Sequence, residues 1–307
     1  MKVIPAHEVA ARSPYPALIA ALRRGLDASL VVPERGAFEL TGNGDSLLTM
    51  PAWRRGGLGG VKIVTVHPRN PAAGLPSVQA QFMAFDVASG RVLAILDGTA
   101  LTTRRTAAVS ALSVELLARP DAARLLIVGT GALAEALATA HSVALPHATV
   151  EIAGRDSTKV RALAARLQAD GVTVQVAGDL RRAVEHADVI VTATTATQPF
   201  IQREWVQPGT HLSLMGAFTK EMAEADQALV AAARIFADTR ASVIAKGGEI
   251  AQAIASGAIT ERAIEDDLFG LVARDIPVAR APNDITLFKS VGSAAFDLVA
   301  AELILHG

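Results

Sequence analysis

Residues 124–145, RLLIVGTGALAEALATAHSVAL, limit the possible folds of this chain more than any other stretch. They begin as an apolar run typical of a buried strand and end as a helix, with small residues spaced G-x-G-x-x-A between. Gly129 permits a tight turn, Gly131 lets a pyrophosphate approach the backbone, and Ala134 lets helix and strand pack closely. The unpaired N–H groups at the helix start favour phosphate. The pattern predicts a dinucleotide-binding loop consisting of Gly129, Thr130, Gly131, Ala132 and Leu133.

Strand and helix patterns alternate after this loop. The runs TVEIAGR, VTVQVAG and DVIVTATT are typical of strands, and STKVRALAARLQAD and DLRRAVEHA are typical of helices. Strands that are apolar throughout and joined by crossover helices indicate a parallel sheet covered on both faces. GTHLSLMG and RIFAD would extend it. We therefore expect an α/β fold with a Rossmann-type doubly wound parallel sheet, the NAD(P)-binding domain, over residues 122–289.

The first 121 residues have a different pattern. Ser13 and Pro14 predict the N-cap and first-turn proline of a helix. The strand-like runs SLLTMPAW, VKIVTVHP and VQAQFMAFDVASGRVLAILDG follow, and ASG within the last predicts a hairpin turn. A helix over 101–118 ends at Arg119-Pro120. We expect a second, mixed α+β domain over 1–121, mostly antiparallel in its sheet, with a boundary near Asp121. The tail DITLFKSVG reads as a loop, and a helix within 290–307 would return to this domain.

Composition narrows the possible partners. The 307 residues carry a formal net charge of −1, so no broad positive field exists to hold a nucleic acid or an anionic membrane surface. There are no cysteines, which excludes disulfides and thiolate metal sites, and we expect no metal. The start MKVIPAHEVAARS lacks the apolar core of a secretory signal. These features predict a cytoplasmic protein whose partners are small molecules or copies of itself.

The end of the second strand of the sheet bears on the choice of cofactor. Proteins that prefer NAD usually place an acidic residue there for the ribose hydroxyls. This chain instead has Arg155, which could pair with a 2′-phosphate, and Ser157 and Thr158, which could donate to it. Alternatively, Arg155 is a solvated charge and Asp156 an N-cap. We expect NADP(H) to be preferred and NAD(H) to remain possible; Thr194 and Thr195 are also predicted to contact the cofactor.

Two cations lie at positions that face a predicted core. Lys62 shares a strand face with Val64 and Val66, where an ammonium needs an anionic partner or its pKa falls. Arg105 begins the apolar face of the 101–118 helix, whereas Arg104 is expected to be solvated. Inward cations suggest a carboxylate-binding pocket. Equally, Lys62 could be a strand-end lysine whose ammonium reaches water.

Two further charged residues have open roles. Glu249 is a candidate proton relay that contacts substrate, or else a solvated acid at a helix start. Lys289 could approach the nicotinamide or simply pair with Asp284. His67, before Pro68, reads as a turn residue.

Beyond these patterns, the chain resembles the ornithine cyclodeaminase/μ-crystallin family over nearly its whole length. MPAW, GVKIVTVHPRN, GLPSVQ, LDGTALTTRRTAA, the glycine loop, PGTHLSLMGAF and DITLFKSVG occur in family order. The resemblance implies that Arg35, Lys62, Ser77 and Arg105 bind the substrate carboxylate and polarise the reacting C–N centre, with Ser77 replacing a threonine. It also implies a homodimer formed through the first domain.

The chain departs from the ornithine cyclodeaminase pattern at two acids. Phe218 occupies the position of a catalytic aspartate, and Leu48 that of a glutamate that binds the distal amine. Ornithine is therefore not the expected substrate. The GAFT loop resembles the branch that reduces Δ1-pyrroline-2-carboxylate and Δ1-piperideine-2-carboxylate to proline and pipecolate, with Lys62, Arg105 and Ser77 as the catalytic residues. The alternatives are an amino acid dehydrogenase or opine-like reductase, a deaminase of the cyclodeaminase type, and a crystallin-like NADPH-binding protein with little catalysis.

Overall fold

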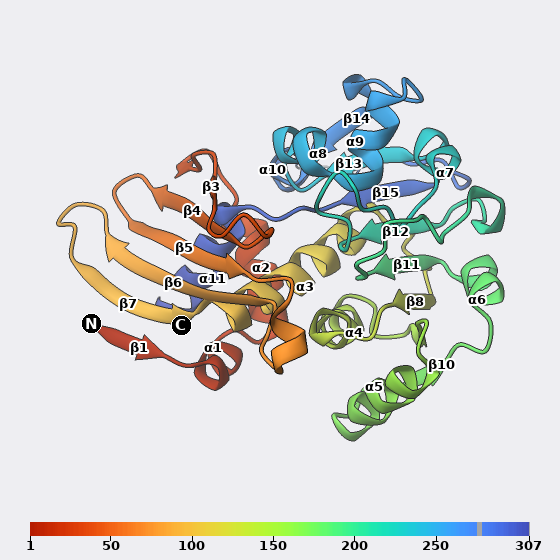
Figure 1. The fold of residues 1–307 in the computed structure, drawn as a ribbon. Helices are drawn as coiled ribbons and strands as arrows, with labels where there is room; N and C mark the ends of the chain where they lie inside the picture. The colour runs from red at the N-terminus through yellow and green to blue at the C-terminus, as the bar shows by residue number, and fades with distance from the viewer. Residues whose placement is uncertain (275–277, 307) are drawn as a thin grey trace. The chain divides into compact units, whose positions relative to one another are not determined.

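A computed structural model describes residues 1–274 and 278–306, apart from the side chain of Pro71. The chain forms two compact units (Figure 1). The first consists of Met1–Arg105 with Ser293–Gly307, and the second of Thr106–Gly292. The chain therefore passes between units inside a helix, at Arg105–Thr106, whereas the sequence placed the boundary near Asp121, where that helix ends.

The first unit contains a seven-stranded sheet. Its strand order is β1-β7-β6-β5-β4-β2, and β3 also pairs with β4. All pairs are antiparallel except β1 with β7, as the sequence predicted for most of this region. The strands are β1 (Lys2–Ile4), β2 (Leu30–Val31), β3 (Gly36–Glu39), β4 (Ser46–Arg54), β5 (Leu58–Val66), β6 (Val78–Asp86) and β7 (Val92–Asp97).

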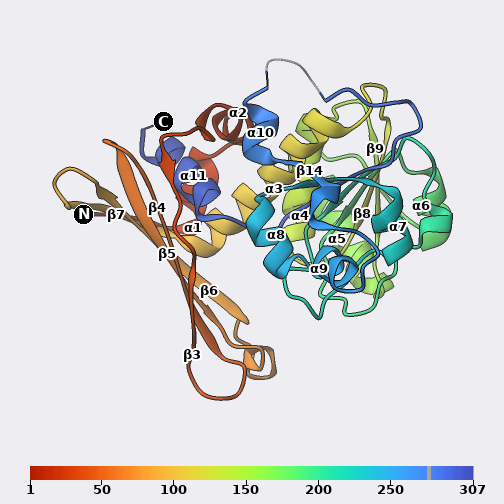
Figure 2. The same cartoon turned by 90° about the horizontal axis from the view of Figure 1, so that it is seen from above.

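Helices cover one face of this sheet. These are α1 (Ala6–Arg12), α2 (Tyr15–Gly25) and α11 (Ala294–His306), and α11 packs on α2, β4 and β5 (Figure 2). The predicted N-cap was wrong: the Ser13 hydroxyl donates to the carbonyl of Val9 and ends α1, a helix that the sequence reading missed. The N-cap of α2 is Pro14, and no side chain caps it.

The second unit is built on eight strands that are parallel throughout. Their order is β10-β9-β8-β11-β12-β15-β13-β14, which confirms the Rossmann-type sheet. All four residues of β11 are buried, as expected for a strand covered on both faces. The strands are β8 (Arg124–Val128), β9 (Thr149–Ala153), β10 (Val174–Val176), β11 (Val189–Thr192), β12 (His211–Leu214), β13 (Arg234–Ala237), β14 (Ile264–Asp267) and β15 (Thr286–Lys289).

The helices of this unit connect the strands. They are α4 (Ala132–Ala144), α5 (Ser157–Ala169), α6 (Leu180–His186), α7 (Gln227–Ala232), α8 (Arg240–Lys246), α9 (Gly248–Ala255) and α10 (Leu268–Val272), and α3 (Gly98–Leu117) enters the unit at Thr106. One prediction is wrong here: the sequence predicts a loop at TLFK, whereas these residues form β15, between β12 and β13. No helix in the described parts of the chain has both the length and the apolar character needed to cross a membrane.

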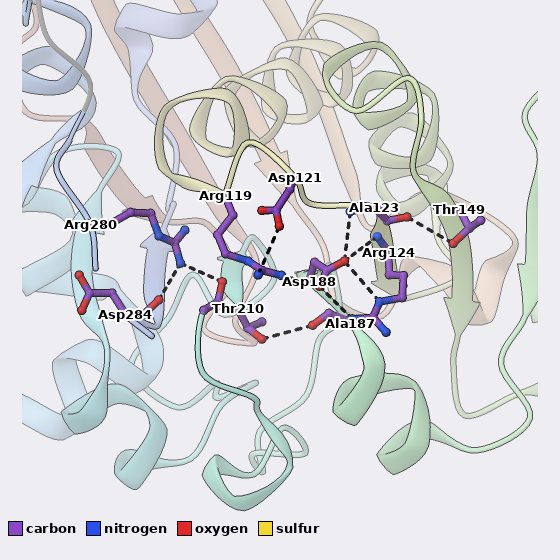
Figure 3. A network of polar contacts seen from close by, with 11 residues as sticks. Arg119, Asp121, Ala123, Arg124, Thr149, Ala187, Asp188, Thr210, Arg280 and Asp284 are labelled. Atoms are coloured by element: carbon purple, nitrogen blue, oxygen red, sulfur yellow. Dashed lines mark hydrogen bonds and ion pairs between the residues drawn. The ribbon is translucent and has the colours of Figure 1, made fainter. Parts of the chain in front are cut away.

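A polar network joins the amino ends of these strands (Figure 3). Asp188, just before β11, accepts hydrogen bonds from Arg119 and Arg124 and from the backbone N–H of Ala123. These contacts fix the start of β8 against the start of β11. The network lies at the edge of the sheet opposite the glycine loop, so we assign it to the fold.

Candidate active site

The glycine loop has the geometry that its sequence predicts. Gly129 adopts a φ of 147°, and a Cβ there would lie 2.7 Å from the carbonyl oxygen of Ala193, so only glycine fits. Gly131 is the N-cap of α4, and a Cβ on it would meet nothing within 4 Å. Ala134 is fully buried in the first turn of the helix. The open space at Gly131 is the approach that a pyrophosphate needs.

The position of the loop in the sheet is also the one that binds nucleotides in this fold. β8 lies between β9 and β11, so the strand order reverses at β8. Ligands of open α/β sheets bind at such a point, outside the carboxyl ends of the strands. Thr130, Ala132 and Leu133 are partly or fully exposed there.

A buried carboxylate that the sequence reading missed organises the neighbouring loops. Glu224, fully buried, accepts hydrogen bonds at 2.7–2.8 Å from the hydroxyl of Thr192, the N–H and hydroxyl of Thr194 and the N–H of Gly216. Thr192 is the last residue of β11, while Thr194 and Gly216 follow β11 and β12. Thr194 is thus held in place by Glu224, while Thr195 is exposed. An acid six residues after GAF gave no periodic signal for burial.

The segment after β9 presents exposed polar groups. Arg155, Ser157 and Thr158 are all exposed, and Arg155 makes no ion pair with any residue that the structure describes. Asp156 caps α5, since its carboxylate accepts from the N–H groups of Thr158 and Lys159 at 2.9 and 3.2 Å. The N-cap interpretation of Asp156 is confirmed.

Glu249 and Lys289 form a buried pair in the second unit. Their side chains are 1% and 0% exposed, and Lys289 Nζ lies 2.9 Å from Glu249 Oε1, without the angle of a hydrogen bond. Burial raises the pKa of Glu249, Lys289 opposes the rise and Glu224 adds to it. The alternative of a solvated Glu249 is wrong because its side chain is buried. A pairing between Lys289 and Asp284 is also wrong, because Lys289 lies against Glu249 and Asp284 pairs with Arg234 at 2.9 Å.

In the first unit, the two predicted inward cations meet on one carboxylate. Lys62 is 1% exposed on β5, and Arg105, on α3, is 4% exposed. Lys62 Nζ lies 2.7 Å from Asp297 Oδ2, and Arg105 Nε lies 2.8 Å from Asp297 Oδ1. Lys62 also donates to Thr102 Oγ1 at 3.1 Å. We call Lys62, Arg105, Asp297 and Thr102 the cation cluster.

The surroundings of Lys62 lower its pKa on balance. Burial has the largest effect and lowers this pKa, Asp297 opposes it, and the positive charges of Arg105 and Arg35 lower it further, so that the Lys62 pKa is about 8. The ammonium therefore exchanges its proton near neutral pH, as a general acid must. The sequence predicted that Lys62 needs an anionic partner but did not identify Asp297.

The other residues that the family resemblance assigns to the site lie in both units. Arg35 is partly buried before β3 and close enough to affect Lys62, whereas Ser77 is partly buried before β6. Leu48 lies on β4 opposite Val64, two residues from Met50, which is opposite Lys62. Phe218, in the second unit, is 51% exposed.

His67 differs from a simple turn residue because its Nδ1 lies 3.4 Å from a carboxylate oxygen of Asp45. Within the described residues, no group of histidine and acidic side chains is arranged to hold a metal ion.

The parallel sheet with a glycine loop at its switch point defines the second unit as a Rossmann-type nucleotide-binding domain. Residues 7–306 match the ornithine cyclodeaminase/mu-crystallin family, and the chain belongs to this family.

Three relatives indicate the range of chemistry in the family. A Δ1-pyrroline-2-carboxylate reductase of Paracoccus denitrificans is 41% identical over 84% of this chain and 82% of its own. The structure of the Thermococcus litoralis Δ1-pyrroline-2-carboxylate reductase, with NADH and L-proline, is 27% identical, covers 100% of this chain and 97% of that one, and superposes with a TM-score of 0.93. An archaeal alanine dehydrogenase dimer with bound NAD is 25% identical over 100% and 95%, with a TM-score of 0.92.

Proposed function

We propose that this protein is an NAD(P)H-dependent reductase of cyclic imino acids, converting Δ1-pyrroline-2-carboxylate or Δ1-piperideine-2-carboxylate to proline or pipecolate. The observation that carries the proposal is the pair of buried cations, Lys62 and Arg105, on adjacent elements of the first unit. Two fixed cations suit a ligand with a carboxylate. Leu48 and Phe218 supply no charge for a second amine, and two relatives named above are reductases of this kind.

The proposed reaction moves a hydride and, where needed, a proton. The hydride leaves C4 of the nicotinamide and forms a bond to C2 of the imine, while the C=N π electrons become the lone pair of the ring nitrogen. If the imine is already protonated, no further proton is required. Otherwise Lys62, whose pKa is about 8, supplies the proton to the ring nitrogen. Arg105 and Lys62, with Arg35 and Ser77, hold the carboxylate and so orient C2. Because Phe218 replaces the aspartate of the ornithine cyclodeaminase pattern, this position supplies no carboxylate that would overstabilise the iminium.

We further propose a preference for NADP(H). Arg155, Ser157 and Thr158 are exposed where a 2′-phosphate would be recognised, and Asp156 is committed to capping α5. The expected result for Arg155→Ala is a loss of the preference for NADPH over NADH by about tenfold, the size of one charge-assisted contact. Lys159→Ala, which removes an exposed cation one turn further, is the control. An unchanged preference in Arg155→Ala would remove this part of the proposal.

The proposal also includes a homodimer in the cytoplasm. Its support is the family resemblance, the dimer named for the archaeal relative, and a row of apolar side chains on the sheet of the first unit that are not fully buried: Val3, Ile95, Met83, Val61 and Pro51.

A second candidate is an amino acid dehydrogenase acting on an open-chain keto acid and ammonia, which the archaeal alanine dehydrogenase favours. Oxidation of NADPH distinguishes the two. We expect turnover with cyclic imines in the absence of added amine, and none with pyruvate plus ammonia. Ornithine with NAD should also give no turnover, because Phe218 and Leu48 replace the two acids of the ornithine cyclodeaminase pattern. Activity that requires ammonia would favour the dehydrogenase, and cofactor binding without any turnover would favour a crystallin-like binding protein.

A further inference from the structure

The helix α11 contains one feature that packing alone does not explain. Its buried residues are apolar except for Asp297, which is 0% exposed between Phe296 and Leu298. Asp297 is separated along the chain by 235 residues from Lys62 and by 192 residues from Arg105, the two cations that it contacts. A buried ion pair is often no more stabilising than apolar side chains of similar volume. Stability therefore gives no sufficient reason for a carboxylate here.

The contacts of Asp297 determine which donors of the cluster are occupied. Asp297 accepts a hydrogen bond from Nε of Arg105, and Arg105 makes no other hydrogen bond to the described residues. Its two terminal nitrogens are not among the fully buried unsatisfied atoms. Because a guanidinium presents its donors in a rigid fork, fixing Nε also fixes the direction of both terminal N–H groups. These groups are then preset for an incoming carboxylate.

The same carboxylate aligns the second cation. Both oxygens of Asp297 lie within 2.9 Å of Lys62 Nζ, and the hydroxyl of Thr102 donates to Gly98 and so accepts from Lys62. Lys62 is thus held between α3 and α11. Without Asp297, the two cations would face each other across an apolar interior and repel.

We propose that Asp297 is the positioning residue of the anion site: a single carboxylate, delivered by the C-terminal helix, aligns Lys62 and Arg105 and keeps Lys62 charged until substrate arrives. The consequence for catalysis rests on the proposed function, but the alignment and the charge of Lys62 do not.

The charge of Lys62 gives a direct test that needs no substrate. The groups that face Lys62 are Asp297 from α11, Thr102 and Arg105 from α3, and Arg35. Only Asp297 raises the Lys62 pKa strongly, so its removal leaves the lowering effects of burial and of both arginines. Lys62 would then lose its proton at lower pH.

The experiment is a pH titration of 13C-labelled lysine side chains by NMR on the full chain, with the Lys62 signal assigned from Lys62→Arg. We expect a Lys62 midpoint near pH 8 in the original protein and at least one pH unit lower in Asp297→Asn. The matched control is Glu302→Gln, which removes a carboxylate from the same helix, where it pairs with Arg54 at 2.8 Å. An Asp297→Asn midpoint equal to that of the control would overturn the proposal.

A second variant covers the case in which Asp297→Asn does not fold. Asp297→Glu keeps the negative charge but moves it by one methylene, so it preserves charge balance and not alignment. We expect kcat/KM for the imine to fall at least tenfold, mainly through KM, while the Lys62 midpoint stays near 8. Full kcat/KM in Asp297→Glu would show that charge alone matters and would refute positioning. If no imine is reduced by any variant, the proposed function fails while the NMR result still decides the role of Asp297.

Discussion

At the scale of single residues, two glycines in the loop after β8 differ in what they require. Gly129 has a left-handed φ and no room for a Cβ, whereas Gly131 has a φ of −83° and open space around it. The first is thus a requirement of the backbone, and the second a requirement of a ligand that must come close.

This difference predicts opposite outcomes for two substitutions. Gly129→Ala should lower the free energy of unfolding by about 1–3 kcal/mol, because it forces an unfavourable φ and a contact with Ala193. Gly131→Ala should lower it by no more than about 1 kcal/mol, because alanine is a poorer N-cap than glycine, but should weaken NADPH binding about tenfold or more, because its methyl group occupies the phosphate approach. Urea unfolding and cofactor fluorescence titration measure the two effects. Equal stability loss in both variants would contradict this account.

The sequence predicted the buried cations but not the acids that serve them. Lys62 and Arg105 stood out because strand alternation and helical spacing placed charges on apolar faces. Asp297 lies on an equally apolar helix, and a lone acid in such a run was the available signal. Its partners are more than 190 residues away, so spacing could not pair them. Glu224 was missed for the same reason, since its donors lie at the carboxyl ends of β11 and β12, which only the folded sheet brings together.

At the scale of elements, most segments were predicted, including the four-residue strands β11, β12 and β13, whereas α1 and β15 were not. The strands β4 to β9 and the helices α3 to α5 match their patterns, because each has enough residues to show a period. β15 is four residues long and follows a turn-like segment, so it resembled a loop. Its place in the sheet depends on β12 and β13, which no local pattern reveals.

The contact of α4 with α3 and β12 contains a buried histidine. His141 Nδ1 donates to the carbonyl of Leu137 at 2.8 Å, and Nε2 lies 3.2 Å from the hydroxyl of Ser110, which in turn contacts the hydroxyl of Ser213 at 2.8 Å. Burial lowers the pKa of His141 to about 4, although the bond to Leu137 opposes this. The ring is therefore neutral in the folded protein at neutral pH.

This burial predicts a specific loss of stability in acid. In the unfolded chain His141 titrates near 6.5, so between pH 6.5 and 4 the unfolded state binds a proton that the folded state does not. The free energy of unfolding is unaffected by His141 above pH 6.5. It falls as the pH decreases below 6.5, and the loss due to His141 is roughly 3 kcal/mol at pH 4. His141→Gln should reduce the slope of unfolding free energy against pH in this window, measured by urea unfolding. His186→Gln, at an exposed position on α6, should keep the original slope, and an unchanged slope in His141→Gln would refute the assignment.

At the scale of the whole molecule, the first unit has an apolar face that its helices do not cover. One row of cross-strand partners runs through Val3, Ile95, Met83, Val61 and Pro51. None of the five is fully buried, and Val3 is 69% exposed. A contiguous apolar row of this kind is typical of a surface that binds another protein.

We expect this face to form the interface of the proposed homodimer. Met83→Glu, at the centre of the row, should convert the protein to a monomer in analytical ultracentrifugation, because a carboxylate would be buried without a partner. The control is Val176→Glu, on the exposed edge strand β10, which should leave the mass unchanged. A dimer that survives Met83→Glu would place the interface elsewhere.

The central claim is that the cation cluster holds the carboxylate of the substrate during hydride transfer. The most direct test compares kcat/KM for Δ1-pyrroline-2-carboxylate in Arg105→Met and in Arg104→Met. The neighbouring Arg104 donates to Ser13 and lies 4.3 Å over the ring of Tyr15, so it serves the fold only. We predict a loss of about 100-fold or more in Arg105→Met, as for a charge-assisted pair, and less than threefold in Arg104→Met. Equal kcat/KM in the two variants would contradict the account.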